Sequence, residues 1–105
     1  MSIFSDRVIK AALSIPKGRV TTYGRLAHAS GGGGMAARSI TSILGKAYEA
    51  GEMRIPFHRI VYANGKIWVS EAYRTKRMKL YKQEGIKVDK NDRIIDFADV
   101  VFDFK

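Results

Sequence analysis

The stretch RIPFHRIV at residues 54–61 places an imidazole, a common acid–base group, beside a guanidinium. His58, next to Arg59, could act as a general base. However, Phe57 directly precedes this pair, the chain contains no cysteine, and no serine or threonine is spaced to pair with His58. We therefore predict no catalytic residues, and we interpret His58 and Arg59 as structural.

Two further residues, Tyr23 in VTTYGRLA and Arg38 in MAARS, have types and positions suited to DNA contact. Arg38 falls in the first turn of a predicted helix, where a cation opposes the helix dipole, so its placement suggests a role beyond solvation. The two alanines before it would let that helix approach DNA closely. Tyr23 offers a rigid ring and a hydroxyl that could press on a backbone phosphate. A solvated arginine and a tyrosine that packs the helix pair are the structural alternatives.

Four consecutive glycines at residues 31–34 invite comparison with a phosphate-binding loop, but the residues after them exclude it. A P-loop continues into Gly-Lys-Ser or Gly-Lys-Thr at the start of a helix, whereas Met35, Ala36 and Ala37 follow here. We interpret the glycines as a turn between two helices, because they disfavour helical backbone. With two histidines and no cysteine, the sequence predicts neither a metal site nor a cofactor.

The charge of the chain points to a polyanionic partner. Its 105 residues carry 19 lysines and arginines against 10 acidic residues, for a net charge of +9. Residues 1–88 hold 16 of the basic side chains and only 5 of the acidic ones, whereas residues 89–105 form an acidic tail. A basic body of this size attracts nucleic acid. No apolar run is long enough to span a membrane, so we expect a cytoplasmic, nucleoid-associated protein.

Hydrophobic periodicity predicts the elements that position these residues. We expect helices over residues 5–15 with Ser5 as N-cap, 21–30 with Thr21 or Thr22 as N-cap, 35–51 and 70–85. Asn64-Gly65 separates two β-branched and aromatic runs, which predicts a hairpin. In the basic last helix we expect Tyr73, Met78 and Tyr81 to be partly buried. Short apolar runs in the tail predict small strands or extended segments.

This order of elements is typical of a winged helix-turn-helix, in which the later helix of the pair enters a DNA groove and the hairpin flanks it. We predict a mainly helical α+β fold, with residues 1–105 forming one domain. Three other interpretations stay open. They are a winged-helix regulator or nucleoid protein that flips no base, a glycosylase or hydrolase that uses His58 with an acid such as Glu71, and an interaction module whose tail (89–105) binds a partner.

The segments IPKGRVTTYGRLA, AARSI and IPFHRIVYANGKI, in this order, resemble the DNA-binding domain of O6-alkylguanine-DNA alkyltransferases. The resemblance covers about residues 3–88. The active-site motif of that family reads Pro-Cys-His-Arg-Val, so Phe57 stands in the place of the alkyl-accepting cysteine. The chain is therefore more similar to the alkyltransferase-like proteins, which replace this cysteine, usually with tryptophan. Since phenylalanine cannot accept an alkyl group, the resemblance implies a protein without enzymatic activity.

The resemblance also implies roles for individual residues. Tyr23 would rotate the phosphate of the target nucleotide, and Arg38 would intercalate and fill the gap left by the flipped base. The recognition helix, around residues 35–46, would lie in the minor groove. The implied DNA-binding residues are Tyr23, Arg38, Thr22, Ala37 and Ser39. The residues implied to line the pocket for the extruded guanine are Tyr23, Phe57, Ile60, Trp68, Val69 and Ser70, with His58 and Arg59 as structural residues nearby.

The function that the resemblance implies is that of a damage sensor. The chain would bind double-stranded DNA that contains O6-alkylguanine, hold the base out of the stack and bend the duplex. The bound complex would then mark the lesion for nucleotide excision repair proteins, which are its implied partners. We expect the protein to act as a monomer, without a cofactor and without contact with a membrane.

Overall fold

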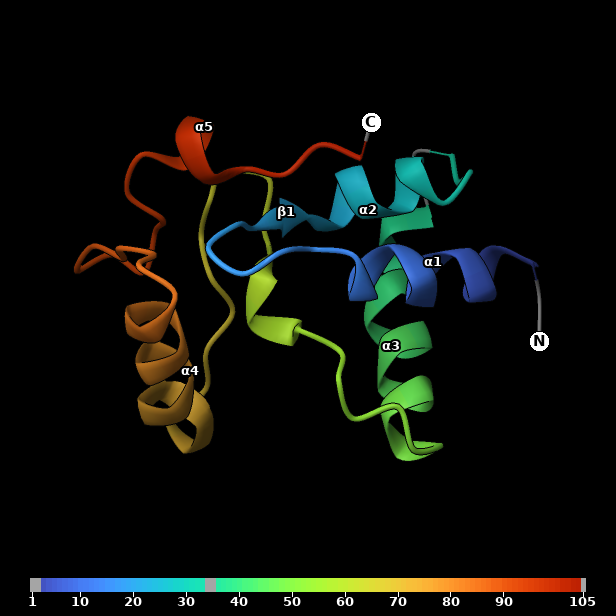
Figure 1. Cartoon of the computed structure of the whole chain (residues 1–105), viewed down its shortest axis with the longest axis horizontal. Helices are drawn as coiled ribbons and strands as arrows, with labels where there is room; N and C mark the ends of the chain where they lie inside the picture. Colours follow the sequence, from blue (N-terminus) through green and yellow to red (C-terminus); the bar gives the residue numbers. More distant parts are fainter. Residues whose placement is uncertain (1–2, 34–35, 105) are drawn as a thin grey trace.

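Helices dominate the computed structural model, which describes residues 3–33 and 36–104 (Figure 1). In chain order the elements are α1 (Ile3–Leu13), β1 (Thr21–Thr22), α2 (Tyr23–Ala29), the 3-10 helix η1 (Ala36–Ser39), α3 (Ile40–Glu49), the 3-10 helix η2 (Phe57–Arg59), β2 (Ile60–Val61), α4 (Glu71–Gln83) and α5 (Phe97–Val100). Gly34 and Met35, which we assigned to the glycine turn and the third helix, lie outside the described residues. Within those residues, no helix is both long and apolar enough to cross a membrane.

The first core cluster lies among α1, α2 and α3, on the right-hand side of Figure 1. Val8 and Ala12 of α1, Leu26 of α2, and Ile40 and Leu44 of α3 are all at most 1% exposed. These residues occupy the apolar stripes that the helical period predicted, so each helix turns one face inward as expected. Local sequence pattern therefore located the helix-turn-helix core correctly.

Two helix starts differ from the prediction. Helix α1 begins at Ile3, so Ser5 lies inside its first turn and is not its N-cap. Phe4 packs against the first core cluster, and this contact holds the additional residues in the helix. The third predicted helix begins as η1 and continues as α3 only from Ile40.

The two short strands join the helix-turn-helix to the segment that carries RIPFHRIV. They pair in parallel, with Thr21 opposite Ile60 and Thr22 opposite Val61. The strands are buried, and they lie at the point where α2 and η2 meet the sheet. Because Tyr23 follows β1 and Phe57 begins the turn before β2, this pairing fixes the two side chains relative to each other.

The predicted hairpin is wrong in its strand pairing, although its turn forms. Gly65 adopts a left-handed φ of +82°, and the amide of Tyr62 donates to the carbonyl of Lys66 over 3.0 Å. The second arm then leaves the first, and the amide of Ile67 donates to the carbonyl of Asp92 in the tail (2.8 Å). Ile67 is only 2% exposed, so pairing with the tail buries an apolar side chain that a free wing would leave in solvent.

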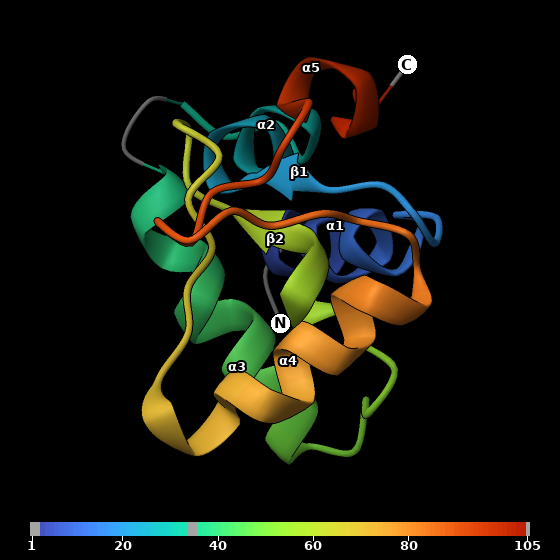
Figure 2. The ribbon, with the colours of Figure 1, turned by 90° about the vertical axis from the view of Figure 1, so that its left-hand side faces the viewer.

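Helix α4 lies across the front of the molecule in Figure 2. Its C-terminal half contributes to a second core cluster, which consists of Val20, Val61, Ile67, Tyr81, Ile86 and Ile94. Tyr81 is 1% exposed and Met78 is half-buried, as predicted. The expectation for Tyr73 is wrong, because this side chain near the start of α4 is 55% exposed. Most of the helix surface is therefore solvated and basic.

The tail folds back over the body instead of extending from it. Val101 forms a parallel bridge with Val20, and Val88 forms an antiparallel bridge with Ile94. Ile94 is 6% exposed and belongs to the second core cluster. The predicted extended segments are therefore confirmed, with the short helix α5 as an addition.

Candidate nucleic-acid interface

The first residue of the candidate interface, Tyr23, is held at the N-terminus of α2 by a side-chain cap. The hydroxyl of Thr22 accepts a hydrogen bond from the backbone amide of Arg25 over 3.1 Å, as an N-cap residue does. Thr22 is only 3% exposed, so the structure uses its side chain to position Tyr23 and keeps it away from the surface. The predicted cap is confirmed.

The second residue, Arg38, is exposed on η1, after the partly buried Ala36 and Ala37. The turn before η1 packs closely against it. A Cβ at Gly32 would lie 2.5 Å from the Cβ of Ala36, so only glycine fits there. Ser39, also exposed, precedes α3 and makes no side-chain capping hydrogen bond. The tight turn therefore presents Arg38 on a surface of small side chains.

The third residue, Phe57, begins η2 and forms a wall between two cavities. The edge of its ring meets the ring of Tyr48 at a centroid distance of 5.8 Å and an interplanar angle of 68°. One cavity, which we call the base pocket, has a volume of about 520 Å³ and is lined by Tyr23, Ala37, Arg38, Thr41, Leu44, Phe57, Ile60, Tyr62, Trp68 and Arg77. The other, which we call the side cavity, has a volume of about 500 Å³.

The base pocket brings together most of the residues that the resemblance implied for it. Tyr23, Phe57, Ile60 and Trp68 all line it, although they are spread over more than forty positions of the chain. Val69 and Ser70 are not among the lining residues. Val69 packs against the second core cluster, and the hydroxyl of Ser70, at the start of α4, is buried without a hydrogen-bond partner.

Sequence reasoning missed Tyr62 and Arg77 as pocket residues. The ring of Tyr62 lies 5.6 Å from that of Tyr23, and the guanidinium of Arg77 lies 5.1 Å over the ring of Trp68. Arg77 also donates to the carbonyl of Trp68 over 3.1 Å. No local pattern distinguishes Arg77 from the other basic residues of its helix as a pocket residue. Tyr62, by contrast, is an aromatic residue close to the predicted turn, and this position could have indicated a pocket residue.

The phenol of Tyr23 is protonated at neutral pH. Burial raises its pKa above the ordinary value of 10.0, and the neighbouring Tyr62 raises it further. A neutral phenol can donate a hydrogen bond to an anionic oxygen such as that of a phosphate. The chemistry of this residue therefore suits a contact with the DNA backbone.

His58 and Arg59 turn away from the base pocket and converge on Glu84, just after α4. His58 Nε2 lies 2.6 Å from Glu84 Oε2, and Arg59 donates through Nε to Oε1 and through an NH2 group to Oε2, both over 3.0 Å. The amide of Gly18 donates to the same carboxylate over 3.1 Å. The hydroxyl of Tyr81 donates to the carbonyl of His58. This cluster joins η2 to α4 and to the turn after α1.

The protonation states in this cluster follow from its contacts. Burial lowers the pKa of His58 below its ordinary 6.5, although the contact with Glu84 opposes the shift. Burial alone would raise the pKa of Glu84, but hydrogen bonds from Arg59, His58 and the Gly18 amide outweigh it and lower that pKa to about 2. At neutral pH, His58 is therefore neutral and donates from Nε2 to an ionised Glu84. The carboxylate of this cluster is that of Glu84 and not that of Glu71, the acid considered from the sequence.

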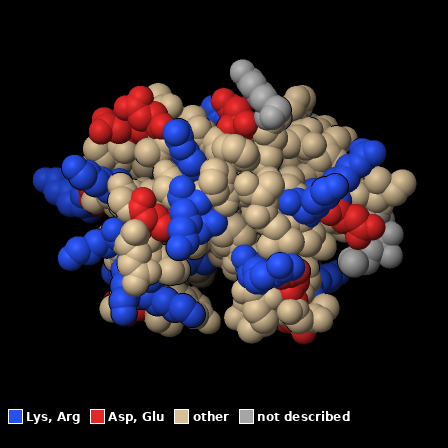
Figure 3. Space-filling model, in the orientation of Figure 1, with Lys and Arg blue, Asp and Glu red and all other residues tan. Residues whose placement is uncertain are grey.

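The surface around these sites is unevenly charged. Figure 3 shows many lysine and arginine side chains over α4 and others on the right-hand half of the molecule, while acidic side chains lie at the upper edge near α5 and at scattered places elsewhere. Among the residues that the structure describes, no cluster of three or more histidines and acids could hold a metal ion. The base pocket itself is lined by aromatic, apolar and cationic side chains together with Thr41.

The family model for the DNA-binding domain of 6-O-methylguanine DNA methyltransferase matches residues 3–86. The chain belongs to this family. Over 94 residues, this family member is 30% identical to a DNA base-flipping protein of Vibrio parahaemolyticus, and the match covers 90% of the chain and 91% of that protein. The predicted relationship to the alkyltransferases and alkyltransferase-like proteins is confirmed.

Solved structures share the fold of this methyltransferase-family domain. S. pombe Atl1 in complex with damaged DNA containing O6-carboxymethylguanine has a TM-score of 0.77 at 22% identity, and the match covers 99% of this chain and 98% of that chain. S. pombe ATL in complex with DNA has a TM-score of 0.71 at 23% identity, with the same coverage. Mycobacterium tuberculosis OGT has a TM-score of 0.62 at 28% identity, and the match covers 86% of this chain but only 53% of that one. The predicted fold class is confirmed.

Proposed function

We propose that this chain is a non-enzymatic sensor of DNA alkylation damage. It binds double-stranded DNA that contains O6-alkylguanine and holds the modified base, rotated out of the stack, in the base pocket. The bound and distorted duplex then marks the lesion for nucleotide excision repair. The names of two relatives support the first part of this proposal, since one is a DNA base-flipping protein and another was solved with damaged DNA.

The observation that carries the proposal is that Tyr23, Arg38 and Phe57 border one cavity. At about 520 Å³, the base pocket falls within the range of small-molecule sites, and its walls are mostly apolar with a few polar groups. A donor for phosphate, a cation that can intercalate and a receptacle for a purine are the parts that base flipping needs. Here they lie on three elements that meet at one opening.

Each part offsets some of the free energy that base extrusion requires, which is on the order of a few kcal/mol. The guanidinium of Arg38 enters the stack and replaces the lost contacts of the extruded base. The neutral phenol of Tyr23 donates to the phosphate of the rotated nucleotide. The rings of Phe57 and Trp68 contact the base, and such contacts are worth about 1–3 kcal/mol.

Alkyl transfer does not take place at Phe57. The reaction would need a nucleophile with a lone pair at this position, and a benzyl ring has none. The nearby His58 is engaged with Glu84 and has no cysteine to deprotonate. The alkyl group therefore stays on the base, and the complex persists as the signal.

A binding titration tests this function. Duplexes that carry a single O6-methylguanine or guanine at the same position are titrated at one fixed salt concentration, because phosphate contacts make the affinity steeply salt-dependent. We expect the methylated duplex to bind about tenfold more tightly or better. Arg38→Ala and Tyr23→Ala should remove most of that preference. Lys46→Ala removes one positive charge near the other end of α3, and it should lower the affinity for both duplexes by the same factor.

Two results would contradict the proposal. Equal affinity for both duplexes would indicate a winged-helix regulator or nucleoid protein that flips no base. The transfer of a labelled methyl group to the protein, or the release of free base or repaired guanine, would show an enzyme instead of a sensor.

A further inference from the structure

The side cavity opens between the C-terminal end of α3 and helix α4, where Figure 3 shows a hollow along the lower edge of the molecule. It shares Phe57, Trp68 and Arg77 with the base pocket, but its other lining residues are its own. The proposed lesion binding uses the opposite side of Phe57. The side cavity is therefore a second recess, next to the proposed lesion site and separated from it by the ring of Phe57.

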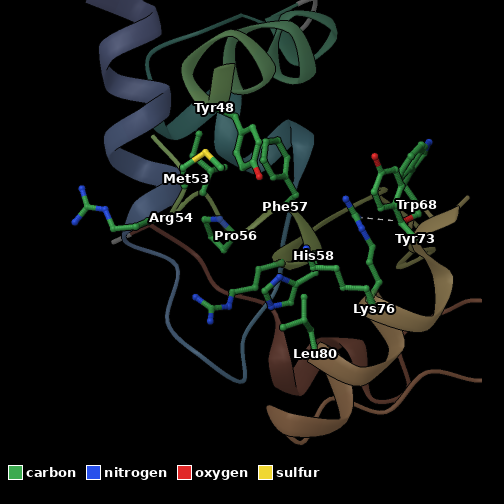
Figure 4. A pocket seen from close by; sticks show the side chains of 13 residues that line it. Tyr48, Met53, Arg54, Pro56, Phe57, His58, Trp68, Tyr73, Lys76 and Leu80 are labelled. Carbon is green, nitrogen blue, oxygen red and sulfur yellow. Dashed lines mark hydrogen bonds between the residues drawn. The ribbon is translucent and has the colours of Figure 1, made fainter. Parts of the chain in front are cut away.

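Exposed apolar side chains gather around this cavity. The large hydrophobic residues that line it include Met53, Tyr73, Trp68 and Tyr48, which are 61%, 55%, 41% and 39% exposed. Figure 4 shows Tyr48 and Met53 on one side of the cavity, and Trp68 with Tyr73 on the other. Contiguous exposed apolar groups with a polar rim are typical of a surface that binds another molecule.

The inner part of the side cavity is mostly apolar, with His58 and Arg59 as its polar lining residues. Ile55 and Pro56 are buried, Leu80 is half-buried, and the ring of Phe57 closes the inner end. A cavity of about 500 Å³ with such an inner part fits one bulky apolar side chain together with part of the backbone that carries it. Side chains of this kind act as anchors in protein interfaces.

The charges around the cavity are all positive. Four basic side chains line it (Arg54, Arg59, Lys76 and Arg77), and no aspartate or glutamate is among the lining residues, although Arg59 is paired with Glu84. Arg54 is paired with Glu52 over 3.0 Å, whereas Lys76 forms no salt bridge with any residue that the structure describes. An occupant with carboxylates next to its apolar anchor would complement this rim.

We propose that the side cavity docks a short acidic segment of a partner protein, which inserts one bulky apolar side chain and pairs its carboxylates with Lys76 and its neighbours. Nucleic acid fits less well. The guanidinium of Arg77 already lies over the ring of Trp68, and Tyr48 meets Phe57 edge-on. Few ring faces are thus left on which a base could stack. The docking surface goes beyond the proposed lesion recognition and does not require it.

The test uses the full chain, labelled with ¹⁵N, and a short synthetic peptide of aspartates and glutamates around a single tryptophan. No DNA is present, so the result is independent of lesion binding. We expect saturable changes in amide shifts at Met53, Phe57, Lys76 and Leu80, with an affinity on the order of micromolar to millimolar. A peptide with alanine in place of tryptophan, or with lysines in place of the acids, should bind at least about tenfold more weakly.

Two charge reversals on α4 distinguish docking in the side cavity from a general attraction of the acidic peptide to the basic surface. Lys76→Glu should lower the affinity for the acidic peptide by about tenfold or more, because it reverses the charge at the rim of the cavity. Lys82→Glu makes the same change at an exposed position of α4 that does not line the cavity, and it should have less than about a twofold effect. Both side chains are exposed, so neither substitution should disturb the fold.

Four outcomes would overturn the proposal. The first is that the peptide causes no saturable change in amide shifts, and the second is that the two charge reversals weaken peptide binding equally. The third is that single-stranded oligothymidylate displaces the peptide. The fourth is that the same amide shifts change with protein concentration alone. The third outcome would assign the cavity to nucleic acid, and the fourth would assign it to a second copy of the chain.

Discussion

His58 Nε2 lies 2.6 Å from Glu84 Oε2, although 26 positions of sequence separate the two residues. This contact ties the turn that carries Phe57 to the end of α4, and Arg59 reinforces it through the same carboxylate. His58 and Arg59, which we interpreted from the sequence as structural, thus connect the turn that carries Phe57 to Glu84.

Removing the charge of Glu84 should destabilise the fold. In Glu84→Gln the guanidinium of Arg59, only 15% exposed, would lose its anionic partner, and breaking a buried pair in this way costs about 3 kcal/mol. Chemical denaturation of the variant measures the loss in unfolding free energy. Glu71→Gln, a matched change in the first turn of the same helix, should cost less than about 1 kcal/mol. Equal effects of the two variants would contradict the assigned role.

The stability of the protein should fall as the pH is lowered. The pKa of Glu84 is about 2 in the folded chain against an ordinary 4.5, so its contribution is complete above 4.5 and is lost as the pH falls toward 2. The pKa of His58 lies below its ordinary 6.5, so folding favours the neutral ring, and this contribution declines as the pH falls below 6.5. Thermal melts from pH 7 to pH 3 measure the slope. Glu84→Gln should flatten it below pH 4.5, and an unchanged slope there would refute the assignment.

Truncating Phe57 should weaken lesion binding more than folding. Phe57→Ala would merge the base pocket with the side cavity and remove an apolar wall, so we expect about a tenfold loss of affinity for the O6-methylguanine duplex. Because the ring is only half-buried, the loss of unfolding free energy should stay near 2 kcal/mol. Phe57→Trp, which keeps an aromatic wall, should retain the preference for the lesion. An alanine variant with full preference would show that the ring does not contact the base.

Trp68 should report occupation of the base pocket. It is the only tryptophan in the sequence, it lines the pocket, and it is 41% exposed. An extruded base would cover the indole, so its emission should shift to shorter wavelength with the methylated duplex and change less with the guanine duplex. Arg77→Ala removes the guanidinium that lies over the ring and should alter the emission of the free protein. Identical spectra for both duplexes would argue against base extrusion.

Deleting residues 89–105 should destabilise the whole domain. The tail supplies the buried Ile94, whose burial contributes about 2 kcal/mol, and the bridge from Val101 to Val20. Its Asp103 also pairs with Arg25 on α2 over 2.9 Å. Thermal unfolding followed by circular dichroism measures the loss. Asp96→Asn, which removes charge at an exposed tail position, should leave the midpoint nearly unchanged. A truncated chain of unaltered stability would favour the interpretation of the tail as a separate interaction module.

Where the determining contacts are local, the sequence predicted the fold well. The apolar stripes through Val8, Leu26 and Leu44 follow the helical period, and the Thr22 cap depends on an amide only three residues away. The charge excess and the absence of cysteine need no coordinates either, because composition alone determines them. The resemblance assigned six residues to one pocket, and the structure places four of them there, namely Tyr23, Phe57, Ile60 and Trp68.

Partners distant in the chain were decided only by the tertiary structure. The second arm after Gly65 pairs with the tail and not with the first arm, because burial of Ile67 beside Ile94 depends on packing that no local pattern records. In the same way, Glu84 looks like one more acid in a basic helix until folding places it between His58 and Arg59. The sequence alone shows that position 57 carries no thiol, whereas three-dimensional packing decided which carboxylate meets His58 and Arg59. The reason is that helix periodicity and capping depend on residues only a few positions apart. Packing in the core, by contrast, brings together residues that are far apart in the chain.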